Sequence, residues 1–159
     1  MKASPATIGL GVTMTIGYGT LYYSFSVLAP EIARDFGWGQ SFVFGVFSFG
    51  LLAGAVAAPM LGRFVDRYGA RLILCLGSIA AALILALFSV MQNAWHFAAI
   101  MLAAEFIALA VQYDAGFAAL AQAHGREARA HITLVTLIAG FASTIFWPLT
   151  GWLVEALGW

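Results

Sequence analysis

Long stretches without charged side chains divide the chain into segments of membrane-spanning length. The uncharged stretches are residues 3–30, 36–62, 72–104 and 130–154. About 20 apolar residues are enough for an α-helix to cross the hydrocarbon core of a bilayer. A further apolar segment at 96–122 follows the polar pair Gln92-Asn93. We therefore predict an all-α integral membrane protein with five transmembrane helices, at about 7–30, 41–61, 72–92, 96–122 and 132–155.

The basic residues predict the orientation of these helices. If the N-terminus is inside, the outside segments hold Arg34 alone, and the inside segments hold the other six basic residues: Lys2, Arg63, Arg67, Arg71, Arg126 and Arg129. Basic residues accumulate on the cytoplasmic side of membrane proteins. We therefore expect a multi-pass protein of the cell (inner) membrane. The first apolar stretch is longer than the core of a signal peptide, so we interpret it as a retained helix. Pro30 is expected to close it, with an outside link from Glu31 to Gln40.

Composition supports lipid as the solvent of this chain. The sequence is 63% hydrophobic and 9% charged, whereas soluble domains carry about 25% charged residues. A net charge of zero argues against a nucleic-acid partner. The single cysteine, Cys75, excludes a disulfide within the chain. His124 and His131 flank an inside hairpin without a third ligand, so we expect no metal site and no cofactor.

The link between the second and third predicted helices is the most densely charged segment. It reads Gly62-Arg63-Phe64-Val65-Asp66-Arg67-Tyr68-Gly69-Ala70-Arg71. Because glycine permits sharp backbone turns, Gly62 and Gly69 predict a tight inside hairpin. A segment that only marks the inner side of the membrane would explain the arginines. It would not require Asp66 or the paired glycines.

The pattern Gly-x-x-x-Asp-Arg-x-Gly-x-Arg in this link resembles the signature between the second and third helices of the major facilitator superfamily, a large group of secondary transporters. The resemblance implies a twelve-helix fold of two halves, of which residues 1–159 would be an incomplete N-terminal half. In that family the matching acid caps a helix of the other half, and the basic residues pair with an acid on the fourth helix. Ala70 departs from the family pattern, which usually has a basic residue there. The implied gating loop consists of Gly62, Asp66, Arg67, Gly69 and Arg71, with Asp114 as acidic partner.

Two acids in the fourth predicted helix are costly to place in a membrane and are therefore candidates for function. Glu105 lies nine residues after His96, near the bilayer midplane at about 1.5 Å per residue. On a regular helix Gln112 shares its face and Asp114 lies opposite. We predict that Glu105 contacts solute or carries a proton, with Gln112 on the same cavity face. A neutral, hydrogen-bonded packing role for Glu105 is the alternative, as is a plain interfacial role for Asp114.

Polar and small residues form stripes on the first and fifth predicted helices. Hydroxyl groups that faced lipid would lack partners, so the stripes should face a cavity or other helices. The first comprises Thr15, Tyr18, Tyr22 and Ser26, and the second comprises Thr133, Thr136, Gly140, Ser143, Trp147 and Gly151. Pro148 should kink the fifth helix around Thr144. The predicted solute cavity contains Tyr18, Tyr22, Ser26, Glu105, Gln112, Thr136, Gly140, Ser143 and Trp147.

Two weaker resemblances concern the branch of the superfamily. Residues 22–30, followed by Phe36-Gly37-Trp38, are similar to the first helix and link of the oxalate/formate and monocarboxylate-type branch, which moves small organic anions. Residues 147–152 match the Gly-Pro-x-x-Gly-Gly signature of the proton-coupled drug antiporters at Pro148 and Gly151. Tryptophans occupy the other two glycine positions.

The superfamily resemblance implies secondary active transport of a small solute by alternating access, with coupling to protons through Glu105 as a hypothesis. A fragment would not be expected to complete the cycle alone. The alternative is a membrane scaffold or accessory subunit that binds a partner through Gly50 and Gly54, because small residues let helices approach closely. The sequence contains no paired nucleophile and base, zinc-protease motif or phosphate-binding loop. We therefore expect neither an enzyme nor a catalytic residue.

Overall fold

The computed structural model describes residues 4–159, so Lys2, which enters the orientation prediction, lies outside the described residues. All regular secondary structure within this range is helical. The helices are α1 (Pro5–Tyr18), a π-helical segment (Gly19–Tyr23), α2 (Ser24–Phe36), α3 (Gln40–Tyr68), α4 (Ala70–Leu87), a 3-10 turn (Phe88–Val90), α5 (Ala94–Val111), α6 (Tyr113–His124), a 3-10 turn (Gly125–Glu127), α7 (Ala128–Ala139) and α8 (Ala142–Leu157).

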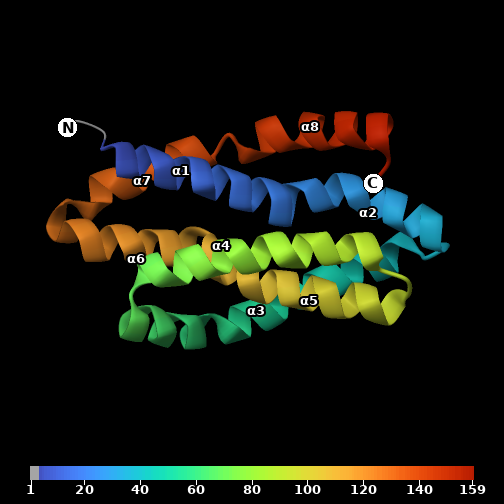
Figure 1. Ribbon diagram of the computed structural model, residues 1–159, viewed down its shortest axis with the longest axis horizontal. Helices are drawn as coiled ribbons and strands as arrows, with labels where there is room; N and C mark the ends of the chain where they lie inside the picture. Colours follow the sequence, from blue (N-terminus) through green and yellow to red (C-terminus); the bar gives the residue numbers. More distant parts are fainter. Residues whose placement is uncertain (1–3) are drawn as a thin grey trace.

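The helices lie along one long axis, and the chain reverses direction at short links (Figure 1). These links are residues 37–39, Gly69, residues 91–93 and Gly125–Glu127. The most extensive contacts join α3 with α5, α1 with α7, and α4 with α5. α1 and α2 therefore pack along α7 and α8, while α3, α4 and α5 form a second packed group beside them.

Buried apolar side chains form clusters along the length of the bundle. One cluster joins α2, α3 and α5 through Phe25, Val43 and Phe97. A second lies between α4 and α5 and includes Leu21. A third, centred on Met14, joins α1 with α6 and α7. Each cluster links helices from distant parts of the sequence, which fixes the positions of the polar residues described below.

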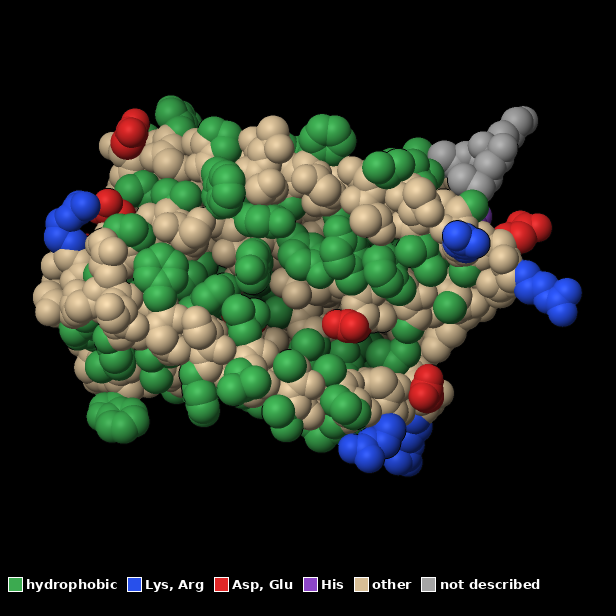
Figure 2. All heavy atoms as spheres, turned by 180° about the vertical axis from the view of Figure 1, so that it is seen from behind, with side chains coloured by type: hydrophobic (Ala, Val, Ile, Leu, Met, Phe, Trp, Pro, Cys, Tyr) green, Lys and Arg blue, Asp and Glu red, His purple; other side chains and the backbone are tan. Residues whose placement is uncertain are grey.

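The outer surface of the bundle is largely apolar in its middle, and its basic side chains lie towards its ends. Val56 on α3 is 78% exposed although it is aliphatic. Figure 2 shows hydrophobic side chains over the middle of one face, where an acidic side chain also lies, and Lys and Arg side chains gathered towards its two ends. Charged side chains are costly within the hydrocarbon region, so this distribution is that of a protein that spans a bilayer.

Three helical stretches among the described residues are long and apolar enough to cross a membrane: Gln40–Tyr68, Ala70–Val90 and Ala94–Leu157. The predicted count of five spans is not confirmed by this finding. The predicted span at 7–30, which covers most of α1, the π-helical segment and part of α2, is not among the three stretches. The predicted spans at 96–122 and 132–155 both lie within Ala94–Leu157, where the turn at Gly125–Glu127 separates them.

The first helical run does not end at Pro30, so that prediction is wrong. Pro30 lies inside α2, which continues to Phe36. Gly37 terminates the helix with a φ of 66°, a left-handed conformation that glycine adopts without steric cost. The link to α3 is therefore limited to residues 37–39, shorter than the predicted link from Glu31 to Gln40.

The fifth predicted helix is interrupted before the position of the expected kink. α7 ends at Ala139 and α8 begins at Ala142, so the interruption lies at Gly140 and Phe141 rather than around Thr144. Pro148 lies within α8. Glycine has low helix propensity, which makes Gly140 the weak point of this run.

Candidate functional site

The charged segment at 62–71 is mostly helical. α3 continues through Tyr68, and the chain turns at Gly69, whose φ of 84° favours glycine. Gly62 lies inside α3, so the prediction that it turns the backbone is wrong. The Arg67 guanidinium lies over the Tyr68 ring, 5.2 Å from its centroid. Arg63, Asp66 and Arg67 thus lie in the last turns of α3, and Arg71 lies in the first turn of α4.

The turn at Gly69 is held by a side chain from α6. Gln122 Oε1 accepts a hydrogen bond of 3.0 Å from the Ala70 backbone N–H. Its Nε2 donates to the Val65 carbonyl at 3.5 Å. Gln122 therefore pairs the Ala70 N–H, which the start of a helix otherwise leaves unpaired. It is a second donor to the Val65 carbonyl, which also accepts the Gly69 N–H. The sequence analysis overlooked Gln122, although a glutamine at the end of an apolar run was a visible signal.

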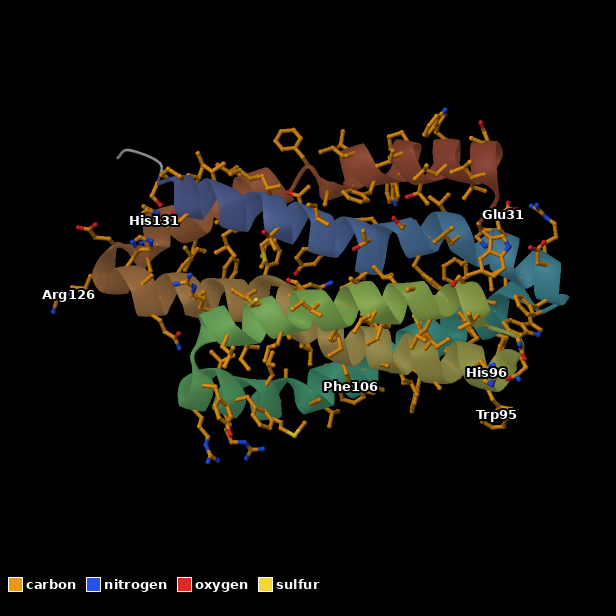
Figure 3. The ribbon with its side chains drawn as sticks, viewed as in Figure 1. Glu31, Trp95, His96, Phe106, Arg126 and His131 are labelled. Carbon is orange, nitrogen blue, oxygen red and sulfur yellow. The ribbon has the colours of Figure 1, made fainter. Side chains whose placement is uncertain are left out.

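Asp66 and Asp114 line one shallow cleft of about 230 Å³, where the last turns of α3 pass the first turns of α6. Gly62 and small apolar side chains complete the lining. The ion pair recorded within the described residues joins Glu31 and Arg34. Figure 3 shows Glu31 at the opposite end of the bundle from Arg126. The structure thus brings Asp114 beside Asp66, and it does not place Arg67 or Arg71 within ion-pair distance of Asp114.

Glu105 is buried between α3 and α5, with only 5% of its surface exposed. A Cβ atom added at Gly50 would lie 2.8 Å from Glu105 Cγ, and one at Gly54 would lie 3.6 Å from the Glu105 carbonyl oxygen. The Gly-x-x-x-Gly pair therefore makes room for Glu105 and its helix. This face of α3 is occupied within the chain itself.

Gln112 does not continue the helical face of Glu105. α5 ends at Val111, and Gln112 adopts an extended conformation with φ −99° and ψ −164° before α6 begins. The helical faces that a regular helix predicts for Gln112 and Asp114 relative to Glu105 therefore do not apply from residue 112 onward. Gln112 is half-buried, and Asp114 is exposed in the first turn of α6.

The predicted stripe on the first helix divides among different environments. Thr15 is buried, and its single hydroxyl proton is shared between the carbonyls of Gly11 at 2.9 Å and Ile138 at 3.3 Å, so it serves helix packing. The Tyr18 ring lies 4.6 Å from that of Tyr113. Tyr22 is 40% exposed. Ser26 is exposed.

Tyr22 belongs to an aromatic group drawn from several helices. Its ring centroid lies 5.3 Å from that of Tyr23 and 5.6 Å from that of Phe47 on α3. Tyr23 in turn lies 5.9 Å from Trp147 on α8. The structure thus connects Tyr22 with Trp147, two predicted cavity residues. It does so through Tyr23, which the sequence analysis did not assign because it lies off the four-residue stripe.

The remaining predicted cavity residues lie along α7 and α8. Thr136 and Gly140 are exposed, Ser143 is half-buried, and Trp147 is 51% exposed. The Thr136 hydroxyl donates to the Ile132 carbonyl of its own helix. These residues form an open face of the described chain, separate from buried Glu105.

The two histidines form a packing contact that joins α1, α6 and α7. His131 is buried, and its Nδ1 lies 2.8 Å from the Thr7 hydroxyl. The His124 ring stacks on it with centroids 3.8 Å apart. Figure 3 places His131 at the same end as Arg126. Across residues 4–159, no group of three or more metal-ligating side chains is close enough to hold an ion.

Comparison with known proteins identifies the family. The family model of the Major Facilitator Superfamily matches residues 10–159. Multidrug resistance protein MdtG of Dickeya zeae (strain Ech586) is 40% identical over 52 residues, which are 33% of this chain and 13% of that protein. The match therefore spans a small part of the relative's length. No solved structure gives a significant match. Because the family match covers nearly the whole sequence, the chain belongs to the Major Facilitator Superfamily, a family of membrane transporters.

Proposed function

We propose that this chain is the N-terminal part of a secondary active transporter that moves a small solute by alternating access. The observation that carries the proposal is the family match over residues 10–159. Transporters of this family have two six-helix halves with the solute near the midplane between them. In this proposal residues 1–159 supply one wall of that solute site, and the activity belongs to the full-length protein.

The proposed topology is five membrane passes with the N-terminus inside, in the cell (inner) membrane. Supporting this, the chain reverses direction at its short links (Figure 1). Arg126 lies at one end of the bundle, and Trp95 and His96 lie at the other (Figure 3). Trp95 is 84% exposed, which suits an aromatic anchor at the outer interface.

The proposed gating loop comprises Gly62, Asp66, Arg67, Gly69 and Arg71, with Asp114 as its counterpart on α6. Its support is the cleft that Asp66 and Asp114 share. Two carboxylates in one cleft repel each other unless a positive group approaches. In this proposal the cleft takes up an arginine of the loop, or a positive group of the other half, in one state of the cycle. Gln122 holds the turn that carries the loop.

The proposed solute wall comprises Tyr18, Tyr22, Ser26, Glu105, Gln112, Thr136, Gly140, Ser143 and Trp147. The aromatic contacts between Tyr22, Tyr23 and Trp147 support a shared surface for part of this set. Small organic anions remain the solute class favoured by residues 22–38. The similarity to a protein named for multidrug resistance supports drug-like solutes as a second class.

Uptake into proteoliposomes tests the proposal directly. The full-length protein would be reconstituted and supplied with radiolabelled oxalate, formate, lactate and a panel of drugs, with and without an imposed pH gradient. Gradient-driven accumulation of one of these solutes is the expected result. If no solute accumulates above the level of empty vesicles, the transport proposal loses its support.

The role of Glu105 as a proton carrier has its own test in the same assay. Glu105→Gln should abolish uptake driven by the pH gradient while leaving the protein folded, because the amide cannot exchange a proton. Gly50 and Gly54 lie against Glu105, and within residues 4–159 Glu105 has no ion-pair partner that this change would leave unpaired. Glu155→Gln, at an exposed position on α8, is the matched control. Unchanged pH dependence in Glu105→Gln would remove Glu105 from the mechanism.

The alternative of a scaffold or accessory subunit relied on a free Gly-x-x-x-Gly face. Gly50 and Gly54 are both buried and are covered by Glu105 and its helix. A partner could reach this face only by displacing α5. This contact therefore favours transport over the scaffold proposal.

A further inference from the structure

The π-helical segment Gly19–Tyr23 is an unusual element in the middle of the first helical run. Its wider turn is visible in the hydrogen bond from the Ser24 backbone N–H to the Gly19 carbonyl, five residues earlier. π-helical turns are rare and occur mostly as single turns, frequently at functional sites. The segment lies between α1 and α2, and Tyr22 and Tyr23 are two of its five residues.

Two contacts from α8 fasten this segment at its start and its end. At the start, the Phe146 ring lies against Gly19 so closely that an added Cβ would be 2.2 Å from a ring atom. At the end, the Ser24 hydroxyl lies 2.8 Å from the Thr150 hydroxyl. Ser24 is 8% exposed and Thr150 is 7% exposed, so water does not readily replace this bond.

The directions of these hydrogen bonds follow from proton counting. The Ser24 hydroxyl donates to the Gly19 carbonyl at 2.8 Å, which uses its one proton. Thr150 must therefore donate to Ser24 Oγ. Thr13, Thr133 and Thr136, by contrast, each donate to the carbonyl four residues earlier on their own helix. Thr150 directs its proton to another helix, where it completes a chain from Thr150 through Ser24 to Gly19.

We propose that Ser24 and Thr150 are positioning residues that hold the π-helical turn and thereby set where the rings of Tyr22 and Tyr23 stand. A π-helical turn accommodates one residue more than an α-helical turn. Relaxation to a regular α-helix would rotate the residues on one side of it by about 100° relative to the other. That rotation would separate Tyr23 from Trp147, and Tyr22 from Phe47. Any effect of these ring positions on solute binding rests on the proposed transport function. The ring positions themselves do not depend on that proposal.

The inference predicts specific changes in the fluorine NMR spectrum of the full-length protein labelled with 3-fluorotyrosine in lipid nanodiscs. Tyr22→Phe, Tyr23→Phe and Tyr68→Phe assign the resonances by deletion. Thr150→Val removes the donor while keeping the side-chain shape, so it should shift the Tyr22 and Tyr23 resonances by more than their line widths. The Tyr68 resonance should stay in place, because Tyr68 stacks on Phe64 near the end of α3.

Two matched variants separate the hydroxyl from the rest of the side chain. Thr150→Ser retains the donor and should leave the Tyr23 resonance within its line width of the wild-type position. Thr13→Val removes a hydroxyl that bonds only within α1, and it should move neither tyrosine. A Thr150→Val protein that keeps the Tyr22, Tyr23 and Tyr68 resonances of the wild type would overturn the inference.

Further outcomes remain decisive if Thr150→Val fails to fold, which loss of the Tyr68 resonance would reveal. In that case Ser24→Ala, which removes a single oxygen, replaces Thr150→Val as the test variant. It should shift the Tyr22 and Tyr23 resonances, and resonances that stay at their wild-type positions would overturn the inference. A displaced Tyr23 resonance in Thr150→Ser would also overturn the inference. Because the readout needs no solute, failure of the uptake assay would count against the transport proposal and leave the positioning roles standing.

Discussion

Glu105 and Asp114 lie nine residues apart in the sequence, yet their surroundings differ in almost every respect. Glu105 is buried between two helices against the glycine face of α3. Asp114 is exposed in the first turn of α6, in a cleft that it shares with Asp66. The break at Gln112 separates the two helices that carry these acids.

This difference shows that the local backbone, and not the residue type alone, determines how exposed each acid is and which groups surround it. Asp114 stands at a helix N-terminus, where the backbone N–H groups stabilise a negative charge. Glu105 stands in the middle of α5, where close packing leaves little room for change. Asp114 is thus accessible in its cleft, whereas Glu105 is part of the packing of the bundle.

The largest effect should come from filling the space opposite Glu105. Gly50→Val adds a Cβ that would lie 2.8 Å from Glu105 Cγ. The resulting overpacking should lower the free energy of unfolding by about 1–3 kcal/mol. Unfolding in mixed micelles by titration with a denaturing detergent measures this change. Gly45→Val is the control, since no atom lies within 4 Å of a Cβ added there. Equal losses in the two variants would mean that Glu105 is not tightly packed.

A smaller loss of stability is expected at the turn between α3 and α4, which Gln122 of α6 holds. Gln122→Leu removes both hydrogen bonds to the α3–α4 turn and should cost about 1 kcal/mol. Hydrogen exchange should be faster at the Ala70 amide, which donates to Gln122. Gln92→Leu, at an exposed position in the link between α4 and α5, should leave that amide unchanged. Unaltered protection of Ala70 in Gln122→Leu would contradict the clamp.

The smallest effect on stability should come from the exposed acid itself. Asp114→Asn should change the free energy of unfolding by no more than about 0.5 kcal/mol, because the lost interaction with the helix N-terminus is offset by relief of the repulsion from Asp66 in the same cleft. The same detergent titration makes the comparison with Gly50→Val. A loss as large as that of Gly50→Val would show that Asp114 is held by contacts as tight as those of Glu105, and the contrast between the two acids would fail.

The family and the helical class follow from the sequence because charge and apolar length are properties of the chain alone. The links near residues 37–39, 69, 91–93 and 125–127 coincide with polar or glycine-containing breaks in the apolar runs. Residues 62–71 carry the family pattern, and the family match confirms that assignment.

The interruptions within the helical runs could not be predicted in the same way. The π-helical turn depends on Thr150 and Phe146, which are more than 120 residues away from it along the chain. The break at Gln112 shifts Asp114 off the face that a regular helix would give it. Such features arise from contacts between helices, so residue spacing on one helix does not reveal them.

The membrane topology is the central claim of this account, because the wall and gate assignments both depend on it. In a Cys75→Ser background, single cysteines at Asn93 and Arg126 would be treated with a membrane-impermeant maleimide in intact cells and after permeabilisation. Five passes with the N-terminus inside predict that Asn93→Cys reacts in intact cells and that Arg126→Cys reacts only after permeabilisation. Labelling of both positions from outside, or the reverse pattern, would contradict the proposed topology and the inward position of the gating loop.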